Sequence, residues 1–249
     1  MSNYKFTLNE EFKNFEYFLC NIKKFFNENK ETIHKARNEI KVIIYENKKI
    51  VVKSFKIPHF INKIVYTFFK KSKAQKSYEY ALKINEFTPK PIGFIEFYKY
   101  GLLDESYFLS EKFDYNFTIR EPLLDINFPN KNEILKSFAK FTFDLHQAGI
   151  FHFDYSPGNI LIKEENNNFI FKIVDINRMK FFDLELDDRL KNFSKLWAKD
   201  DDLKIIIKEY AKFLKVDENE LITRAINFSH KHKAKINLKK RLKGKKVVD

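Results

Sequence analysis

Apolar residues near the start of the chain recur at the spacing of an α-helix. A single helical face would carry Phe12, Phe15, Phe18, Leu19, Ile22, Phe25 and Phe26. Thr7 with Glu10 three residues later forms the pattern of a capping box, in which two side chains satisfy backbone N–H groups at a helix start. The pattern therefore predicts a helix that begins just after Thr7.

From residue 40 the apolar positions change from helical spacing to extended runs. The runs "IKVIIY" and "IVVKSF", joined by the turn "ENKK", predict a β-hairpin. A helix is expected over residues 72–87, and it should end at Thr88 because a residue before proline disfavours helical backbone. The runs "GFIEFY" and "SYFLSEKF" predict two more strands around Gly101. The first part of the chain is thus expected to be a small sheet with helices.

The second half is expected to be richer in helices. Asn130 and Glu133 can cap a helix whose apolar residues run from Ile134 to Leu145, and Gly149 suits the position just after its end. Two strands, "NILIKE" and "FIFKIVDI", follow, and capping aspartates then precede segments such as "DDLKIIIKEYAKFL" and "DENELITRAINF". No linker rich in Gly, Ser or Pro divides the halves. The stretch "FDYN" near Asp114 is therefore interpreted as a hinge between two lobes, residues 1–113 and 114–249.

Composition narrows the class of protein. The chain has 249 residues, 44% hydrophobic and 33% charged, as expected of a soluble globular protein. Cys20 is the only cysteine, so no intrachain disulfide forms, and we interpret it as a buried structural thiol in a reducing compartment. Neither a signal peptide nor a transmembrane run is visible, which favours a cytoplasmic protein.

The net charge of +13 predicts attraction to anionic partners, although the many Lys, Phe and Tyr residues also fit an AT-rich coding bias. Residues 231–249 hold nine Lys or Arg and one acidic residue. This basic segment is either a solvated helix end or a surface that docks on anionic lipid. No nucleic-acid binding motif accompanies it, so a nucleic-acid partner is not expected.

Five residues fall in the order that phosphoryl transfer requires. A strand lysine holds nucleotide phosphates, a helical glutamate orients it, a carboxylate meets the acceptor hydroxyl, and an amide with a second carboxylate holds magnesium. The chain offers, in that order, Lys53, Glu79, Asp154, Asn159 and Asp175.

Each of these residues also has a simpler interpretation. Lys53 alone could be an ordinary strand lysine, and Glu79 alone is more often a solvated helix charge. Asp154 and Asn159 are more specific, because they lie in the turn-rich motif "HFDYSPGN" directly before an apolar strand. Asp175 ends the apolar run "FKIV", where a carboxylate needs compensation, and His152 is expected to be structural.

The motifs "LHQAGIFHFDYSPGNILI" and "VDINRMKF", with the earlier "VVKSFKIP" and "KAQKSYEYA", resemble the bacterial lipopolysaccharide core kinase family, which comprises the Kdo and heptose kinases. The resemblance covers roughly residues 37–178. It implies an α+β, bilobal protein-kinase-like fold with a small β-rich N-terminal lobe and a mainly helical C-terminal lobe. It also implies ATP- and Mg²⁺-dependent phosphorylation of a sugar hydroxyl in the lipopolysaccharide core or a lipid A precursor, at the cytoplasmic face of the inner membrane.

Site roles follow from the same resemblance. It implies that Lys53 pairs with Glu79 and binds phosphate, that Asp154 is the catalytic base, and that Asn159 and Asp175 bind magnesium. Further nucleotide-binding candidates are Arg37, Asn38, Glu111 and Phe113, and Arg178 is a candidate for an anionic substrate or for an ion pair.

The chain departs from protein kinases in three places. Phe153 stands where most of them carry arginine, and Asp175 is followed by Ile-Asn-Arg, so control by a phosphorylated activation loop is not expected. The stretch "ETIHKARNEIK" takes the place of a glycine-rich loop. Two rivals remain: a kinase of the same fold that acts on a small molecule or a protein, and a nucleotide-binding pseudokinase scaffold.

Overall fold

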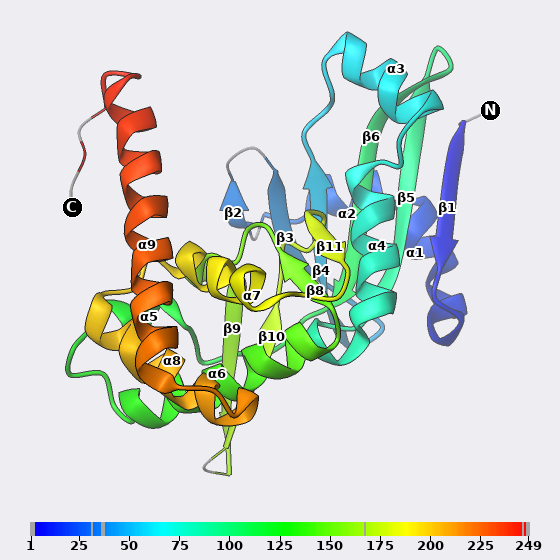
Figure 1. Ribbon diagram of the computed structural model, residues 1–249. Coiled ribbons are helices and arrows are strands. Elements are labelled where there is room, and N and C mark those ends of the chain that lie inside the picture. The colour runs from blue at the N-terminus through cyan, green and yellow to red at the C-terminus, as the bar shows by residue number, and fades with distance from the viewer. Residues whose placement is uncertain (1–2, 31, 36–37, 167, 246, 248–249) are drawn as a thin grey trace. The chain divides into compact units, whose positions relative to one another are not determined.

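The computed structural model describes residues 3–30, 32–35, 38–166, 168–245 and 247, and the backbone alone of residues 32–35. The chain divides into two compact units, Met1–Asp114 and Tyr115–Asp249 (Figure 1). Unit 1 is built on an antiparallel sheet, and unit 2 is mainly helical. The α+β composition predicted from the sequence is confirmed.

The sheet of unit 1 has six strands in the order β1-β5-β6-β4-β3-β2, and all neighbours are antiparallel. The predicted hairpin and the two strands around Gly101 are confirmed. Gly101 itself has a φ of +75°, which the tight turn between β5 and β6 requires. The strands are β1 (Tyr4–Leu8), β2 (Thr32–Lys35), β3 (Glu39–Tyr45), β4 (Lys48–Phe55), β5 (Pro91–Lys99) and β6 (Leu102–Glu111).

The single helix predicted after Thr7 is wrong. Thr7 lies in β1, opposite Phe94 of β5, and the next turn is capped by Asn9, whose side chain accepts from the Glu11 N–H. The following residues form η1 (Glu10–Phe15), α1 (Glu16–Cys20) and α2 (Ile22–Glu28), with a break at Asn21. The apolar positions are still buried, because each short helix turns its apolar side to the sheet.

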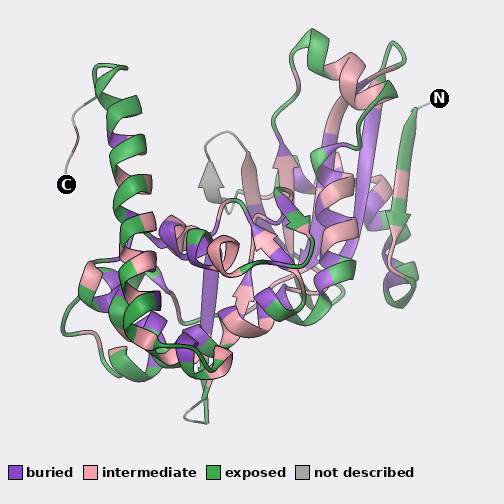
Figure 2. Cartoon of the chain, viewed as in Figure 1, coloured by how far each residue is buried: buried purple, intermediate pink, exposed green. Residues whose placement is uncertain are grey.

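Two apolar layers cover the two faces of this sheet. One layer joins η1, α1 and α2 to side chains such as Ile50, Val52 and Leu109. The other joins Phe55 and Phe94 to α4 (Lys73–Ile84). Since neighbouring strand residues point to opposite faces, β5 is buried along most of its length (Figure 2).

The helix predicted over residues 72–87 is confirmed as α4 followed by η2 (Asn85–Phe87). Ser72 caps it by accepting from the Gln75 N–H at 3.1 Å, and the chain leaves the helix at Thr88 as expected. A further helix, α3 (Phe60–Phe68), packs against β6 but has no buried residue.

Unit 2 places helices around two small sheets. One sheet has the order β10-β9-β7 and the other pairs β8 with β11. The helices are α5 (Arg120–Leu124), α6 (Lys131–Gln147), η3 (Pro157–Asn159), α7 (Leu186–Phe193), η4 (Ser194–Leu196), α8 (Asp200–Leu214) and α9 (Glu218–Arg241). The strands are β7 (Phe117–Thr118), β8 (Ile150–His152), β9 (Ile160–Glu165), β10 (Asn168–Ile173) and β11 (Met179–Phe181).

The ends of α6 differ in how well the sequence predicted them. Asn130 precedes the helix with a φ of 55°, and its side chain makes no capping hydrogen bond, so the predicted cap is wrong. A buried ion pair of Lys131 with Asp202, 2.8 Å long, instead ties this end to α8. Gly149 follows the helix with a φ of +69°, as predicted.

Most of the basic segment near the C-terminus belongs to α9. This helix packs against α7, η4 and α8, and Ser229 is buried in that interface. Lys233 donates to the Ala198 carbonyl oxygen at 2.7 Å. Residues 231–241 are therefore helical and packed as far as Asn237, and residues 238–241 are exposed, as expected of a solvated helix end. Among the described helices, none is both long enough and apolar enough to cross a membrane.

Candidate active site

The loop that carries Asp154 is fixed at both ends by short strands of unit 2. Strand β8 pairs with β11, so that His152 lies opposite Met179. The Phe153 N–H then donates to the Arg178 carbonyl oxygen at 3.1 Å, and the Asn159 N–H closes a turn onto the Ser156 carbonyl oxygen at 2.9 Å. The sequence folds this way because Ser156-Pro157-Gly158 cannot continue a strand.

His152 is fully buried, and both of its ring nitrogens are bonded. Nε2 lies 3.1 Å from the Val174 carbonyl oxygen, and Nδ1 accepts from the Asp154 N–H at 3.0 Å. Burial lowers the pKa of His152, so the ring is neutral with its proton on Nε2. This arrangement agrees with the structural role expected for His152 and positions the backbone of Asp154.

A second buried group supports the same loop from the helices. The Asn192 amide Nδ2 donates to the His152 carbonyl oxygen at 2.8 Å, and its Oδ1 lies 3.1 Å from His146 Nε2. His146 Nδ1 lies 2.8 Å from the Tyr210 hydroxyl. Burial lowers the pKa of His146 to about 3, so it is neutral, donates from Nε2 to Asn192 and accepts from Tyr210.

Asn159 is oriented by the loop that contains it. Its Nδ2 donates to the Asp154 carbonyl oxygen at 2.9 Å, which commits the amide nitrogen and leaves the side-chain oxygen to act as an acceptor. The Val174 N–H donates to the backbone oxygen of Asn159 at 2.9 Å. This bond places the start of the Asp175 segment beside the loop, so Asp154, Asn159 and Asp175 lie in one region of unit 2.

Asp175 has a backbone conformation that is uncommon for a residue with a side chain. Its φ is 57°, in the left-handed region, and its Oδ1 accepts from Asn177 Nδ2 at 2.7 Å. Such strain is typical of functional positions, where surrounding bonds hold the residue. The half-buried Asp175 thus lies two residues after the end of β10, close to the end of the apolar run as the sequence predicted.

Arg120 is a residue near the loop that the sequence did not single out. A Cβ atom on Gly158 would lie 2.5 Å from Arg120 Nη2, so glycine is what allows the guanidinium to approach the loop. In the sequence, the only indication of this contact was the glycine inside the "SPGN" motif.

In unit 1, Lys53 lies on the sheet face that α4 covers. It is opposite Phe108 in the β4–β6 register, and its Nζ lies 5.3 Å from the centre of the Phe55 ring on the same face. Glu79 is on α4 and accepts from Lys71 Nζ with both oxygens, at 2.8 and 2.7 Å, and from Gln75 Nε2 at 3.0 Å. The Lys53–Glu79 pair stays a prediction.

A second strand lysine shows how a structural lysine differs from a candidate ligand. Lys41 is buried, and its Nζ donates to the carbonyl oxygens of Phe26 and Asn29, at 2.7 and 2.8 Å. Lys41 thereby donates to carbonyl oxygens at the C-terminal end of α2 that have no partner within the helix.

The other nucleotide-binding candidates are dispersed over the sheet edge and the end of β6. Arg37 lies outside the described residues. Asn38 accepts from the Lys56 N–H at 3.3 Å, which joins the β2–β3 connection to the end of β4. Glu111 ends β6, 3.4 Å from Lys48 Nζ, and Phe113 is half-buried two residues later. The described residues of the segment expected to replace a glycine-rich loop therefore belong to β2 and β3, which pair antiparallel.

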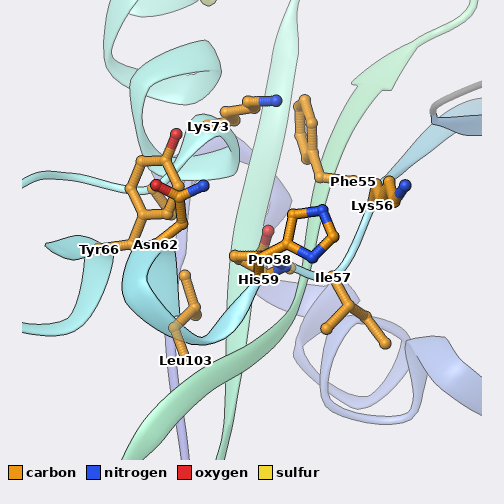
Figure 3. Close-up of a pocket in the computed structure, with 11 residues that line it drawn as sticks. Phe55, Lys56, Ile57, Pro58, His59, Asn62, Tyr66, Lys73 and Leu103 are labelled. Carbon is orange, nitrogen blue, oxygen red and sulfur yellow. The ribbon is translucent and has the colours of Figure 1, made fainter. Parts of the chain in front are cut away.

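A pocket of about 370 Å³ in unit 1 contains none of the candidate residues. Its wall includes Phe55, His59, Tyr66, Lys73 and Leu103, from the end of β4, from α3 and α4 and from β6 (Figure 3). Both polar and apolar residues line it.

Comparison with known proteins bears on the fold. Neither a protein-family model nor a curated protein matches the chain. Among solved structures, the chain is similar to WaaP in complex with acyl carrier protein, with a TM-score of 0.61 and 14% identity over 92% of this chain and 99% of that one. At this identity the likeness establishes the fold alone, an α+β fold that is consistent with the kinase-like one expected from the sequence.

Proposed function

We propose that the protein is an ATP- and Mg²⁺-dependent kinase that phosphorylates a sugar hydroxyl, of Kdo or heptose, in the inner core of lipopolysaccharide. The observation that carries the proposal is the ordered loop of unit 2, in which Asp154 and Asn159 are joined by a 2.9 Å hydrogen bond and the Asp175 segment is bonded to the same loop. A carboxylate, an amide and a second carboxylate in one place are the groups that phosphoryl transfer requires.

Asn159 and Asp175 fit a magnesium ion by their chemistry. Mg²⁺ prefers oxygen ligands, and the bond from Asn159 Nδ2 to Asp154 leaves an amide oxygen as the ligand atom. The strained backbone of Asp175 presents a carboxylate at the end of a buried strand. Bound Mg²⁺ and ATP would supply the phosphoryl group and neutralise charge on its oxygens.

Asp154 would accept a hydrogen bond from the acceptor hydroxyl and take its proton as the new bond forms. His152 and Asn192 would contribute by holding the backbone of this loop still, because positioning accounts for much of the rate in this kind of reaction. Lys53 would bind nucleotide phosphates, with Glu79 as its orienting partner; Asn38, Glu111 and Phe113 remain candidates for nucleotide contacts.

Two observations favour a sugar acceptor over a protein. The motifs around Asp154 and Asp175 resemble those of the lipopolysaccharide core kinase family, and the chain shares its fold with WaaP. In addition, Phe153 replaces the arginine that reads a phosphorylated activation loop in protein kinases. The filled catalytic positions argue against a pseudokinase scaffold.

A peripheral position at the cytoplasmic face of the inner membrane is part of the proposal. The exposed basic residues at the end of α9 would face anionic lipid, at about 1 kcal/mol for each residue close to the surface. Since α9 is packed as far as Asn237, neutralising Lys239, Lys240 and Arg241 tests this better than truncation. Unchanged binding of that variant to anionic vesicles would contradict the membrane role. WaaP was solved in complex with acyl carrier protein, so acyl carrier protein is an alternative partner to test in the same assay.

The activity test offers labelled ATP with purified core-bearing lipid A, with soluble alcohols and with a generic protein. We expect label in the lipid only, and we expect Asp154→Asn to reduce transfer about 10²–10⁴-fold. Asp201→Asn, on a side chain that is 91% exposed, is the matched control and should be fully active. Label in protein alone, or full activity of Asp154→Asn, would contradict the proposal. Mass spectrometry of lipopolysaccharide from a deletion strain should show one phosphate missing.

A further inference from the structure

Helix α3 is attached to the sheet of unit 1 by its polar side. Lys63 forms an ion pair with Asp104 of β6. Thr67 Oγ1, one turn further along the helix, accepts from the Leu103 N–H at 2.9 Å. Tyr66 lies on the same side, three residues after Lys63, and lines the pocket of unit 1 (Figure 3). The polar residues of α3 therefore occupy the place at the sheet that apolar residues of a helix usually take.

The opposite side of α3 is apolar and exposed. No residue of this helix is buried (Figure 2), and Phe60, Ile61 and Phe68 are 68%, 75% and 67% exposed. Their spacing places these three side chains on one side of the helix. Exposed apolar side chains continue past both ends, to Ile57 at 48% and Phe69 at 77%. We call these five residues the α3 apolar surface.

The α3 apolar surface takes no part in the apolar layers of unit 1. The layer formed with η1, α1 and α2 and the layer formed with α4 contain none of its five residues. Single exposed apolar residues are ordinary in globular proteins, but here five gather within residues 57–69. An exposed apolar cluster of this kind marks a surface that binds a partner.

Lysines surround this surface, and no acidic residue lies among them in the sequence. Residues 56–76 contain six Lys and neither Asp nor Glu. Lys56 precedes the apolar residues, Lys70 and Lys73 follow them, and all three are exposed. Within the part of the chain that the structure describes, none of these three lysines forms a salt bridge. A partner that matches this face is therefore apolar where it meets α3 and negatively charged around it.

We propose that the α3 apolar surface docks the protein on a membrane that contains anionic lipid. The apolar side chains enter the boundary between headgroups and acyl chains, and Lys56, Lys70 and Lys73 bind lipid phosphates. Lysine suits this place, because its long stem follows the apolar side chains while its ammonium group stays among the headgroups. A protein partner matches less well, since it would need a groove shaped to hold the side chains of a single helix that stands on its polar side.

This docking surface is separate from the end of α9, and it does not rest on the proposed function. The contact proposed for Lys239, Lys240 and Arg241 is electrostatic, so salt weakens it. Insertion of apolar side chains is not screened by salt. Part of the binding to anionic vesicles should therefore persist in about 1 M NaCl.

The first test measures flotation of the full-length protein with vesicles of equal parts phosphatidylglycerol and phosphatidylcholine. We expect Ile61→Ser and Phe68→Ser each to weaken binding about tenfold, because each removes an apolar side chain that leaves water on docking. Ile44→Ser, at a position of β3 that is 69% exposed, makes the same change as Ile61→Ser and should bind like the wild type. Thermal unfolding of each variant checks that the fold is kept.

Charge variants test the role of the lysines. Lys70→Gln should weaken binding to the same vesicles about fivefold at low salt, and pure phosphatidylcholine vesicles should bind the wild type more weakly. Lys24→Gln, at an exposed position of α2, makes the same charge change away from the surface and should have no effect.

A second test detects insertion of α3 directly. Trp197 is the only tryptophan, so Ile61→Trp in a Trp197→Phe background carries one fluorophore on the α3 apolar surface. We expect anionic vesicles to shift its emission to shorter wavelength, and lipids brominated in their acyl chains to quench it. Ile44→Trp in the same background is the matched control and should show neither effect.

The outcomes identify what covers the surface. If the wild type does not bind anionic vesicles, if Ile61→Ser binds them like the wild type, or if brominated lipid does not quench the Ile61→Trp variant, the membrane docking is wrong. Self-association in sedimentation, or binding of acyl carrier protein, that Ile61→Ser abolishes while vesicle binding is kept would also overturn it. Vesicle binding requires neither ATP nor Asp154, so this proposal and the kinase proposal can fail independently.

Discussion

Replacement of Asn192 by leucine should disable the candidate catalytic loop from a distance. Asn192 is fully buried on α7, and it joins the His152 carbonyl oxygen to His146 through bonds of 2.8 and 3.1 Å. Leucine has a similar volume but cannot donate or accept. The change therefore removes the two bonds without leaving a large cavity.

The expected magnitude follows from the groups left behind. The His152 carbonyl oxygen and the His146 Nε2–H both lose their partner in a buried place, and each such group costs about 1–3 kcal/mol. The free energy of unfolding should fall by about 2–6 kcal/mol in total. Because the His152 backbone leads directly into Asp154, a shift of the loop should also lower kcat, by about 10²-fold for a displacement of ~1 Å.

The chain contains a convenient probe for this measurement. Trp197 is the only tryptophan, and it lies in unit 2 with Asn192, so its fluorescence reports on urea unfolding of that unit. Asn132→Leu, at an exposed position of α6, makes the same chemical change and should stay within about 0.5 kcal/mol of the wild type. If Asn192→Leu lowers the free energy of unfolding by less than about 0.5 kcal/mol and leaves kcat unchanged, the role assigned to the hydrogen bonds of Asn192 is refuted.

Three further predictions concern stability. The pKa of His146 is about 3 in the folded protein, against an ordinary value of 6.5, so the unfolded chain binds the proton first as pH drops. The free energy of unfolding should therefore fall between about pH 6.5 and pH 3, by up to about 1.4 kcal/mol per pH unit. His146→Gln should flatten this slope, and an equal slope in that variant would contradict the prediction. Lys131→Met should lower the free energy of unfolding in urea by about 3–5 kcal/mol, because it leaves the buried carboxylate of Asp202 without its ion pair. Lys140→Met breaks an exposed ion pair on the same helix and should lower it by less than about 0.5 kcal/mol. Similar losses in the two variants would refute the distinction between buried and exposed pairs. A left-handed backbone costs an alanine about 1–2 kcal/mol, and Gly149→Ala should lower the free energy of unfolding by more than this, because its Cβ would lie 2.9 Å from the Phe182 carbonyl oxygen. Gly101→Ala has a similar φ and open space around the added Cβ, so calorimetry of this control measures the backbone cost alone.

Local patterns predicted those parts of the fold that depend on local interactions. The β3–β4 hairpin, α4 and the strands that flank the candidate catalytic loop all appear where the spacing of apolar residues placed them. The order Asp154, Asn159, Asp175 was also readable, because turn residues and apolar runs put each of them at the end of a strand.

Elements that are stabilised by residues far away in the sequence could not be predicted from local patterns. The Thr7 and Glu10 pattern favours a helix locally, but pairing of β1 with β5, some 90 residues away, supplies more backbone hydrogen bonds. Asn130 failed as a cap for the same reason, since the ion pair with Asp202 fixes that end of α6 from another helix.

The residues that support the candidate catalytic loop could not be predicted from the sequence either. Asn192 is one asparagine among many, and nothing in its neighbours shows that it will meet the loop of His152.

The bonds that hold the candidate catalytic loop have a consequence for synthesis of the chain. His152 depends on Asn192, 40 residues further on, and His146 on Tyr210, 64 residues further on. A growing chain on the ribosome therefore carries Asp154, Asn159 and Asp175 long before it can order them. An unfinished or prematurely released chain should therefore lack the proposed phosphotransfer activity, because the bonds to this loop form only when α7 and α8 have been made and packed.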